Sequence, residues 1–396
     1  MLKIQKKDGS IEAFSSQKIV SAIRKSANRA MYDLSDEQCR RVVDLTLAHL
    51  AEHGGDVAPV ANVHNAVERA LDDVAPDVAK CYRDYRNYKQ DFVHMLDDVY
   101  RKSQAIRYIG DRNNANTDSA LVPTQRSLIY NELSSALYKK FFLNREEREA
   151  MKDGYIYIHD RSARLDCMNC CLFDMANVLT GGFEMGNVWY NEPKTLDVAF
   201  DVISDVAISA AACQYGGFTI PEVDKILAPY ADKSYRKYFE EYTEIAVHNS
   251  LGEYEDVLAA ADEYATKKVQ RDMEQGFQSW EYRFNTVGSS RGDYPFIAVS
   301  FGLDNSRFGR MASMTCMNVR AGGQGAAGHK KPVLFPKLTF LYDEELHGEG
   351  KPMEDVFECG VDCSTKAMYP DFLSLTGEGY IPSMYKKYGR VVSPMG

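Results

Sequence analysis

The sequence has no long apolar run and no export signal. None of its apolar segments approaches the roughly 18 to 20 residues that a membrane-spanning helix needs. The first ten residues, MLKIQKKDGS, lack the apolar core of a signal peptide. The nine cysteines are odd in number and scattered, so they do not outline a disulfide framework. We therefore predict a cytoplasmic protein with reduced thiols and no membrane partner.

A surplus of basic residues is also absent. Lys and Arg number 47 against 57 Asp and Glu, which gives a net charge of −10. Proteins that bind nucleic acid through its phosphates need a basic surface, so we predict no nucleic-acid partner. The chain has 396 residues, 45% of them apolar, so it can bury a large core, and its length suggests about two domains.

Two common ligand motifs are missing. The glycine-rich stretch 320–331, RAGGQGAAGHKK, lacks the Gly-Lys-Ser/Thr end of a P-loop. Neither Cys359 with Cys363 nor Cys167 with Cys170 has further His or Cys partners at zinc-ligand spacing, so we predict no metal site in this chain. The stretch 320–331 still offers glycine amides and lysines to a phosphate, and an ordinary surface loop is the alternative.

Residues 1–95 have the pattern of a small separate unit. Asp8-Gly9 lies between the apolar segments 2–4 and 11–14, which predicts a β-hairpin because such a turn requires positive φ. Ser35 and Gln38 have the spacing of a capping box at the start of a helix. Apolar residues at helical spacing predict four helices, which begin near Ser16, Asp36, Val60 and Pro76.

A run of thiols follows a short apolar segment in the middle of the chain. The segment 155–158, YIYI, predicts a short buried strand, and His159-Asp160 at its end can hydrogen-bond each other. Cys167, Cys170 and Cys171 come next. Thiols at a strand end beside a His-Asp pair suit redox or radical chemistry. Buried structural cysteines are the alternative, because free Cys is among the most buried residue types.

The remaining chain alternates helical and strand patterns, which indicates an α/β class. Gly216-Gly217 allows the backbone to approach a neighbour or a ligand closely. Helices are predicted over 196–212, most of 223–284 and 355–368, and strands near 213–220, 295–301 and 333–341.

Short motifs in one constant order then point to a family. They include His159-Asp160, Asn169-Cys170-Cys171-Leu172, Gly181-Gly182-Phe183, Gln214-Tyr215-Gly216-Gly217, Phe335-Pro336-Lys337-Leu338, Met368-Tyr369-Pro370-Asp371 and Ser393-Pro394-Met395-Gly396. In this order they resemble the anaerobic (class III, glycyl-radical) ribonucleoside-triphosphate reductases. The N-terminal residues Lys6-Lys7-Asp8-Gly9, Glu12, Phe14, Lys18-Ile19 and His64 resemble the ATP-cone, the activity-regulating domain of ribonucleotide reductases.

The resemblance implies a fold and its domain boundaries. Residues 1–95 would form the ATP-cone, with four helices and a β-hairpin, and residues 96–120 a connector. Residues 121–396 would form the first part of a ten-stranded α/β barrel. In the family, the Pro-Met-Gly motif is followed by the cysteine that becomes a thiyl radical, whereas this sequence ends at Gly396. We therefore expect the 396-residue chain to be inactive alone.

The resemblance also implies that the ATP-cone binds ATP and dATP, with Mg²⁺, as allosteric effectors. Lysines supply ammonium groups for phosphate oxygens, and free amides at the Asp8-Gly9 turn and at the first helix N-terminus add partial positive charge. Glu12 could accept from the adenine amino group or hold Mg²⁺. Taken singly, these residues could equally be solvated lysines and a helix histidine. The expected site consists of Lys6, Lys7, Asp8, Gly9, Glu12, Phe14, Lys18, Ile19 and His64.

Catalytic roles follow from the same resemblance. Cys170 matches the second active-site cysteine, which delivers a reducing hydrogen to the ribose. His159 would order the site, and Asn169 would bond the substrate or cap the loop. Cys167 and Cys171 would only pack. The residues expected in the loop between effector and substrate sites are Gly322, Gly323, Gly325, Lys330 and Lys331.

The implied cofactors and partners extend beyond these residues. A glycyl radical and a zinc site would lie in the C-terminal part of the family's chains, and formate would be the reductant. The expected partners are ribonucleoside triphosphate substrates, a radical-SAM iron–sulfur activating enzyme and a second copy of the chain, with higher oligomers in dATP. Two alternatives stay open, namely a nucleotide-binding regulatory protein and another glycyl-radical enzyme.

Overall fold

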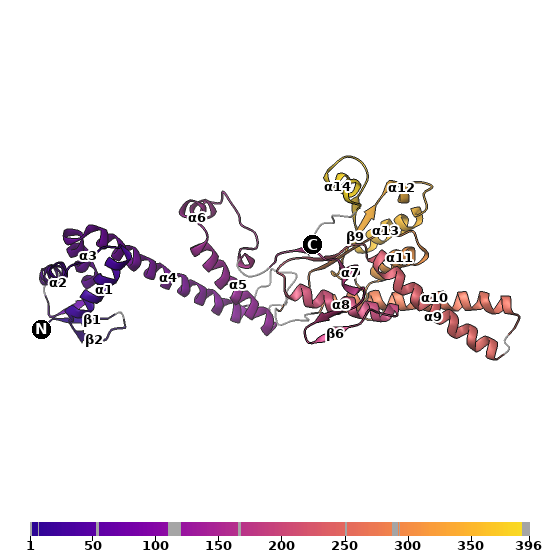
Figure 1. The fold of residues 1–396 in the computed structure, drawn as a ribbon, viewed down its shortest axis with the longest axis horizontal. Coiled ribbons are helices and arrows are strands. Elements are labelled where there is room, and N and C mark those ends of the chain that lie inside the picture. Colours follow the sequence, from indigo (N-terminus) through magenta and orange to yellow (C-terminus); the bar gives the residue numbers. More distant parts are fainter. Residues whose placement is uncertain are drawn as a thin grey trace. The chain divides into compact units, whose positions relative to one another are not determined.

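The computed structural model divides the chain into two compact units, Met1–Arg101 and Lys102–Gly396 (Figure 1). The structure describes residues 2–6, 8–52, 55–109, 120–164, 168–249, 252–286, 292 and 294–389. The division falls within a long helix, α4 (Pro76–Ile109). The expected connector, 96–120, is therefore helical up to Ile109, and most of its remainder lies outside the described residues.

The N-terminal unit is a three-stranded sheet with four helices. The predicted hairpin is confirmed, because β1 (Lys3–Gln5) pairs antiparallel with β2 (Ile11–Ala13) and Gly9 has a φ of 83°. The sequence did not predict β3 (Val57–Pro59), which pairs parallel with β1. Three residues ending in proline are too short a pattern to signal a strand. The helices are α1 (Ser16–Arg29), α2 (Asp36–Ala51), α3 (Val60–Val74) and α4.

The C-terminal unit is organised on a five-stranded sheet of order β10-β9-β8-β7-β4, in which every pair is parallel. The predicted α/β class is confirmed. Neighbours in the sheet follow one another along the chain with helices between them, as in the first part of an α/β barrel. The strands are β4 (Cys171–Leu172), β7 (Phe218–Ile220), β8 (Ile297–Phe301), β9 (Lys337–Tyr342) and β10 (Asp371–Ser374).

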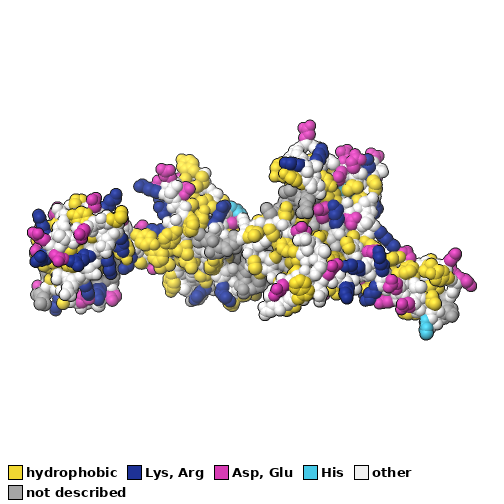
Figure 2. Space-filling view, viewed as in Figure 1, with side chains coloured by type: hydrophobic (Ala, Val, Ile, Leu, Met, Phe, Trp, Pro, Cys, Tyr) yellow, Lys and Arg dark blue, Asp and Glu magenta, His cyan; other side chains and the backbone are white. Residues whose placement is uncertain are grey.

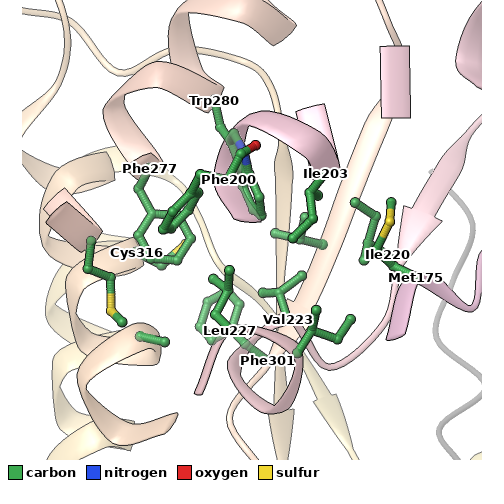
Figure 3. Close-up of a cluster of buried hydrophobic side chains, with 14 of the residues drawn as sticks. Met175, Phe200, Ile203, Ile220, Val223, Leu227, Phe277, Trp280, Phe301 and Cys316 are labelled. Carbon is green, nitrogen blue, oxygen red and sulfur yellow. The ribbon is translucent and has the colours of Figure 1, made fainter. Parts of the chain in front are cut away.

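Long helices cover this sheet and form the main core with it. Phe200 of α8 (Leu196–Ala212) contacts the rings of Phe277 and Trp280 of α10 (Tyr254–Phe284) at centroid distances of 5.0 and 4.9 Å (Figure 3). The indole Nε1 of the fully buried Trp280 donates to the carbonyl oxygen of Phe200 at 3.1 Å. The main helices are α8 (Leu196–Ala212), α9 (Val223–His248), α10 (Tyr254–Phe284), α11 (Arg307–Gly322) and α13 (Glu354–Ala367).

The predicted buried strand at 155–158 is wrong. This segment has no strand pairing, and the side chains of Tyr155 and Tyr157 are each 84% exposed. Its backbone instead continues the turn after α6 (Arg145–Lys152), since the Tyr155 amide donates to the Ala150 carbonyl oxygen at 2.9 Å. An alternating pattern shows that a strand is compatible with the side chains, but it does not supply a pairing partner.

Shorter elements complete the unit, and no helix among the described residues is both long and apolar enough to cross a membrane. They are α5 (Val122–Phe141), a 3-10 turn (Arg161–Ala163), α7 (Met175–Leu179), β5 (Phe183–Met185) paired with β6 (Val188–Tyr190), α12 (Glu344–His347) and α14 (Tyr380–Tyr388).

Candidate functional site

Cys170 lies directly before β4, and the backbone of Gly216 and Gly217, which precede β7, approaches it closely. Its Sγ accepts a hydrogen bond from the Gly217 amide at 3.2 Å. A Cβ on Gly216 would lie only 2.6 Å from this Sγ and 2.8 Å from the Asn169 carbonyl oxygen, so only glycine fits at position 216. Cys170 is half-buried, and the thiol is held by backbone rather than by packed aliphatic side chains.

The other two expected catalytic residues meet at one carboxylate. Asp160 Oδ2 lies 2.6 Å from His159 Nδ1 and accepts from Asn169 Nδ2 at 3.1 Å. The predicted contact between His159 and Asp160 is thus confirmed, and Asp160 joins it to the residue beside Cys170. The His159 side chain is three-quarters exposed, whereas Asp160 is mostly covered. His159, Asn169 and Cys170 therefore form one cluster, with Asp160 as a member that the sequence pattern paired only with His159.

The neighbouring thiols differ from Cys170. Cys171 packs against the main hydrophobic core, and its Sγ accepts from Gln214 Nε2 at 2.7 Å. Consecutive residues of an extended chain point to opposite faces, which explains why Cys170 and Cys171 have different surroundings. Cys167 lies outside the described residues.

In the N-terminal unit, one acidic side chain collects the expected lysines. Glu12 of β2 forms ion pairs with Lys6 and Lys18, each at 2.8 Å. Hydrogen bonds from Lys18 and then Lys6 lower the pKa of Glu12, and the bond to Glu12 raises the pKa of Lys6. Figure 2 shows basic and acidic side chains interspersed on the visible surface of this unit. The three residues lie at the surface, where phosphate oxygens could exchange with the Glu12 carboxylate.

The remaining expected ATP-cone residues divide between turn and core. Asp8 accepts from the Ser10 amide and hydroxyl at 3.0 and 2.6 Å, and these bonds lower its pKa. Phe14 is half-buried, and Ile19 is buried in the helical core. His64 Nδ1 lies 2.7 Å from the Tyr82 hydroxyl, and burial raises the pKa of Tyr82 to about 12. Lys7 lies outside the described residues.

The glycine-rich segment starts later than the sequence suggested. The expected loop, 320–331, is wrong at its start, because Arg320 to Gly322 form the last turn of α11, whose hydrogen bonding continues through them. Gly323 has a φ of 66° and Gly325 one of 131°, so both positions favour glycine. Gln324 and Lys331 exchange two backbone hydrogen bonds of 2.8 and 2.9 Å. The exposed Lys330 and Lys331 lie at the end of this closed loop, which we name the glycine loop, residues 323–331.

One surface feature was not predicted. A groove of about 520 Å³ runs along α10. It is lined by Met311 of α11 and by the α10 residues Tyr264, Thr266, Lys267, Lys268, Gln270, Arg271 and Glu274. Lys268 Nζ lies 5.9 Å from the centroid of the Tyr264 ring. Lys267 and Lys268 are four and three residues before Arg271, so the sequence predicts that these cations are neighbours on the helix, but this spacing does not predict a groove.

Family models match both parts of the chain. A family model described as anaerobic ribonucleoside-triphosphate reductase matches residues 113–396, and one described as ATP cone domain matches residues 2–91. Anaerobic ribonucleoside-triphosphate reductase of Escherichia coli (strain K12) is 30% identical over 99% of this chain and 53% of its own length. That of Enterobacteria phage T4 is 32% identical over 72% of this chain and 44% of its own length.

Solved structures give a weaker likeness. The anaerobic ribonucleotide reductase from Thermotoga maritima in complex with dATP and CTP has a TM-score of 0.41 and 13% identity, covering 73% of this chain and 50% of its own. The chain spans about half the length of the curated relatives it matches.

Proposed function

The chain belongs to the anaerobic ribonucleoside-triphosphate reductase family, and from that premise we propose that it serves the reduction of ribonucleoside triphosphates to deoxyribonucleoside triphosphates. The observation that carries the proposal is the Cys170 thiol, which is only partly buried and is held at one strand end by the Gly217 amide. The family match favours this reaction over that of another glycyl-radical enzyme.

The proposed role of Cys170 is to deliver a hydrogen atom to C2′ of the ribose. A glycyl radical would supply the one-electron chemistry that an unactivated 2′-hydroxyl requires. Overall, the 2′-hydroxyl would take up a proton and leave as water. Formate, oxidised to carbon dioxide, would supply the two electrons and restore the hydrogen that Cys170 delivers. Gly217 fixes the sulfur position. Asn169 donates a hydrogen bond from Nδ2 to Asp160. The Oδ1 of Asn169 would accept a hydrogen bond from a substrate hydroxyl.

The Glu12 cluster supports regulation by ATP and dATP. Lys6 and Lys18 both contact the Glu12 carboxylate, so their ammonium groups are already close together. A triphosphate can therefore bind both lysines at a small cost in side-chain ordering. No group of three or more His, Cys, Asp or Glu among the described residues could hold a metal ion alone. In this proposal, Mg²⁺ binds the nucleotide phosphates, with Glu12 as its protein ligand. The loop lysines Lys330 and Lys331 would serve a second phosphate group.

The proposal extends to the partners of the family. A radical-SAM activating enzyme would generate the glycyl radical. Zinc would stabilise the C-terminal part of the family's chains. Two copies of the chain would associate, and larger assemblies would form with dATP. We further propose that the protein acts in the cytoplasm.

Formation of dCTP from CTP tests the reaction. The full-length gene product is incubated anaerobically with an activating enzyme, formate and ATP. Cys170→Ser should lower dCTP formation at least about a thousandfold because it removes the hydrogen donor, whereas Cys171→Ser should retain most of it. Equal activity of the Cys170→Ser and parent proteins would contradict the role of Cys170. ATP binding without any dCTP would instead favour a nucleotide-binding regulatory protein.

A further inference from the structure

The C-terminal end of α10 carries three polar side chains on one face, two in its last two turns and one on Asn285, the residue that follows the helix. Gln278, Glu281 and Asn285 are spaced three and four residues apart, so they lie above one another along the helix. Their neighbours Phe277 and Trp280 are buried in the main core. Glu281 is buried, and Gln278 and Asn285 are partly buried. Buried polar groups are costly unless they form hydrogen bonds, so the partners of this polar stripe indicate its role.

The first partner is Gln324, at the start of the glycine loop. Its Nε2 donates to Glu281 Oε2 at 2.6 Å, and its Oε1 accepts from Gln278 Nε2 at 3.2 Å. Both ends of one amide are therefore bound to α10. Gln324 also pairs through its backbone with Lys331, so its side chain connects the base of the loop to α10.

The second partner lies just beyond the other end of the loop. Asn285 Nδ2 donates to the Phe335 carbonyl oxygen at 2.6 Å, and Asn285 Oδ1 accepts from the Phe335 amide at 3.1 Å. Arg320 completes the arrangement, because its Nε donates to Glu281 Oε1 at 2.6 Å and its Nη2 to the Pro336 carbonyl oxygen at 2.7 Å.

We propose that Gln278, Glu281 and Asn285 form a clamp that fixes both ends of the glycine loop and orients residues 325–330 to bind the triphosphate of a nucleotide. The inference rests on the proposed role of Lys330 and Lys331. The clamp residues are positioning residues, because they hold the loop rather than contact the ligand. A loop fixed at both ends loses less conformational freedom when an anion binds, which increases its affinity.

Hydrogen exchange on the 396-residue chain tests the clamp without any ligand. Gln324→Ala removes both amide contacts and leaves the buried Glu281–Arg320 pair intact. The amides of Gln324 and Lys331 should then exchange at least about tenfold faster, while the urea midpoint followed by tryptophan fluorescence should fall less than in Arg320→Met, because Glu281 keeps its charged partner. Gln270→Ala, which truncates another amide of α10, is the matched control and should leave loop exchange unchanged. Equal exchange in parent and Gln324→Ala chains overturns the clamp.

Inorganic triphosphate tests the ligand, in chains that carry Glu12→Ala and Lys18→Ala so that the ATP-cone is silent. It should slow exchange of the loop amides, with a dissociation constant about tenfold higher in the Gln324→Ala chain. Lys330→Ala with Lys331→Ala should abolish this protection. Faster exchange in Gln324→Ala, without protection of the parent loop by triphosphate, overturns the phosphate-binding role of the loop but leaves the clamp standing.

Discussion

The two units use charge in opposite ways. In the N-terminal unit, Glu12, Lys6 and Lys18 form ion pairs at the surface, with lysine side chains 46% and 66% exposed. In the C-terminal unit, the pair between Glu281 and Arg320 is 4% and 1% exposed and is connected to the backbone. Surface ion pairs add little to stability because water and salt screen them, whereas a buried charge without its partner is strongly destabilising.

The comparison teaches that an exposed ion pair can form part of a ligand-binding site, whereas a buried ion pair holds the fold together. The exposed cluster can exchange one anion for another, which suits a site that senses nucleotides. The buried pair cannot exchange with solvent, and it holds backbone segments that are far apart in the sequence. Four variants would break or sharpen this distinction; the first three are measured by urea unfolding and the fourth by thermal unfolding and ATP binding. Both tryptophans, Trp189 and Trp280, lie in the C-terminal unit, so their fluorescence follows this unit alone.

Arg320→Met should have the largest effect. It leaves the Glu281 carboxylate buried without its counter-charge, and we expect a loss of about 3–5 kcal/mol in the free energy of unfolding. Urea titration followed by tryptophan fluorescence measures it. The double variant Glu281→Leu with Arg320→Met should recover most of the loss. A single variant as stable as the parent would show that the pair is not an essential buried contact.

Gly216→Ala should have the next largest effect. The added Cβ would lie 2.6–2.8 Å from Cys170 Sγ and the Asn169 carbonyl oxygen, so backbone must shift. Overpacking of this kind costs about 1–3 kcal/mol in unfolding free energy. Gly322→Ala is the control, because it is helical and no atom lies within 4 Å of its Cβ position. Equal urea midpoints for both variants would refute the close approach at Cys170.

His347 should make stability depend on pH. It is 1% exposed, its Nε2 lies 2.8 Å from the Gly302 carbonyl oxygen, and burial lowers its pKa from 6.5. Below pH 6.5, His347 therefore binds a proton more readily in the unfolded chain than in the folded chain. The contribution of the neutral His347 to the free energy of unfolding is present above pH 6.5. It is lost as the pH falls below that value, by at most about 1.4 kcal/mol per pH unit. His347→Gln should flatten this slope in urea titrations between pH 7 and 5.5, and an unchanged slope would contradict the assignment.

Glu12→Ala with Lys18→Ala should have the smallest effect on stability and a large one on binding. Circular dichroism should show the same thermal midpoint, because these groups are exposed. Isothermal titration should show ATP affinity reduced at least about tenfold. Lys25→Ala, an exposed cation of α1, is the matched control. Parent-like ATP affinity in the double variant would place the nucleotide elsewhere.

Local sequence rules determined much of the N-terminal unit. The Asp8-Gly9 turn and the Ser35–Gln38 capping box formed as predicted, because each needs only a few neighbouring residues. The helix at 196–212 was also predicted correctly from its apolar spacing. Resemblance drew attention to Cys170, but its chemical role remains a proposal.

Tertiary structure decided what depends on distant partners. The segment 155–158 has the alternation of a strand, yet without a paired edge it lies exposed. The clamp joins residues 39 to 50 positions apart, and periodicity within α10 cannot reveal which backbone its polar stripe will meet. Hydrogen-bond partners at that separation exist only once the helices and strands have packed, because burial is what makes each polar group require one.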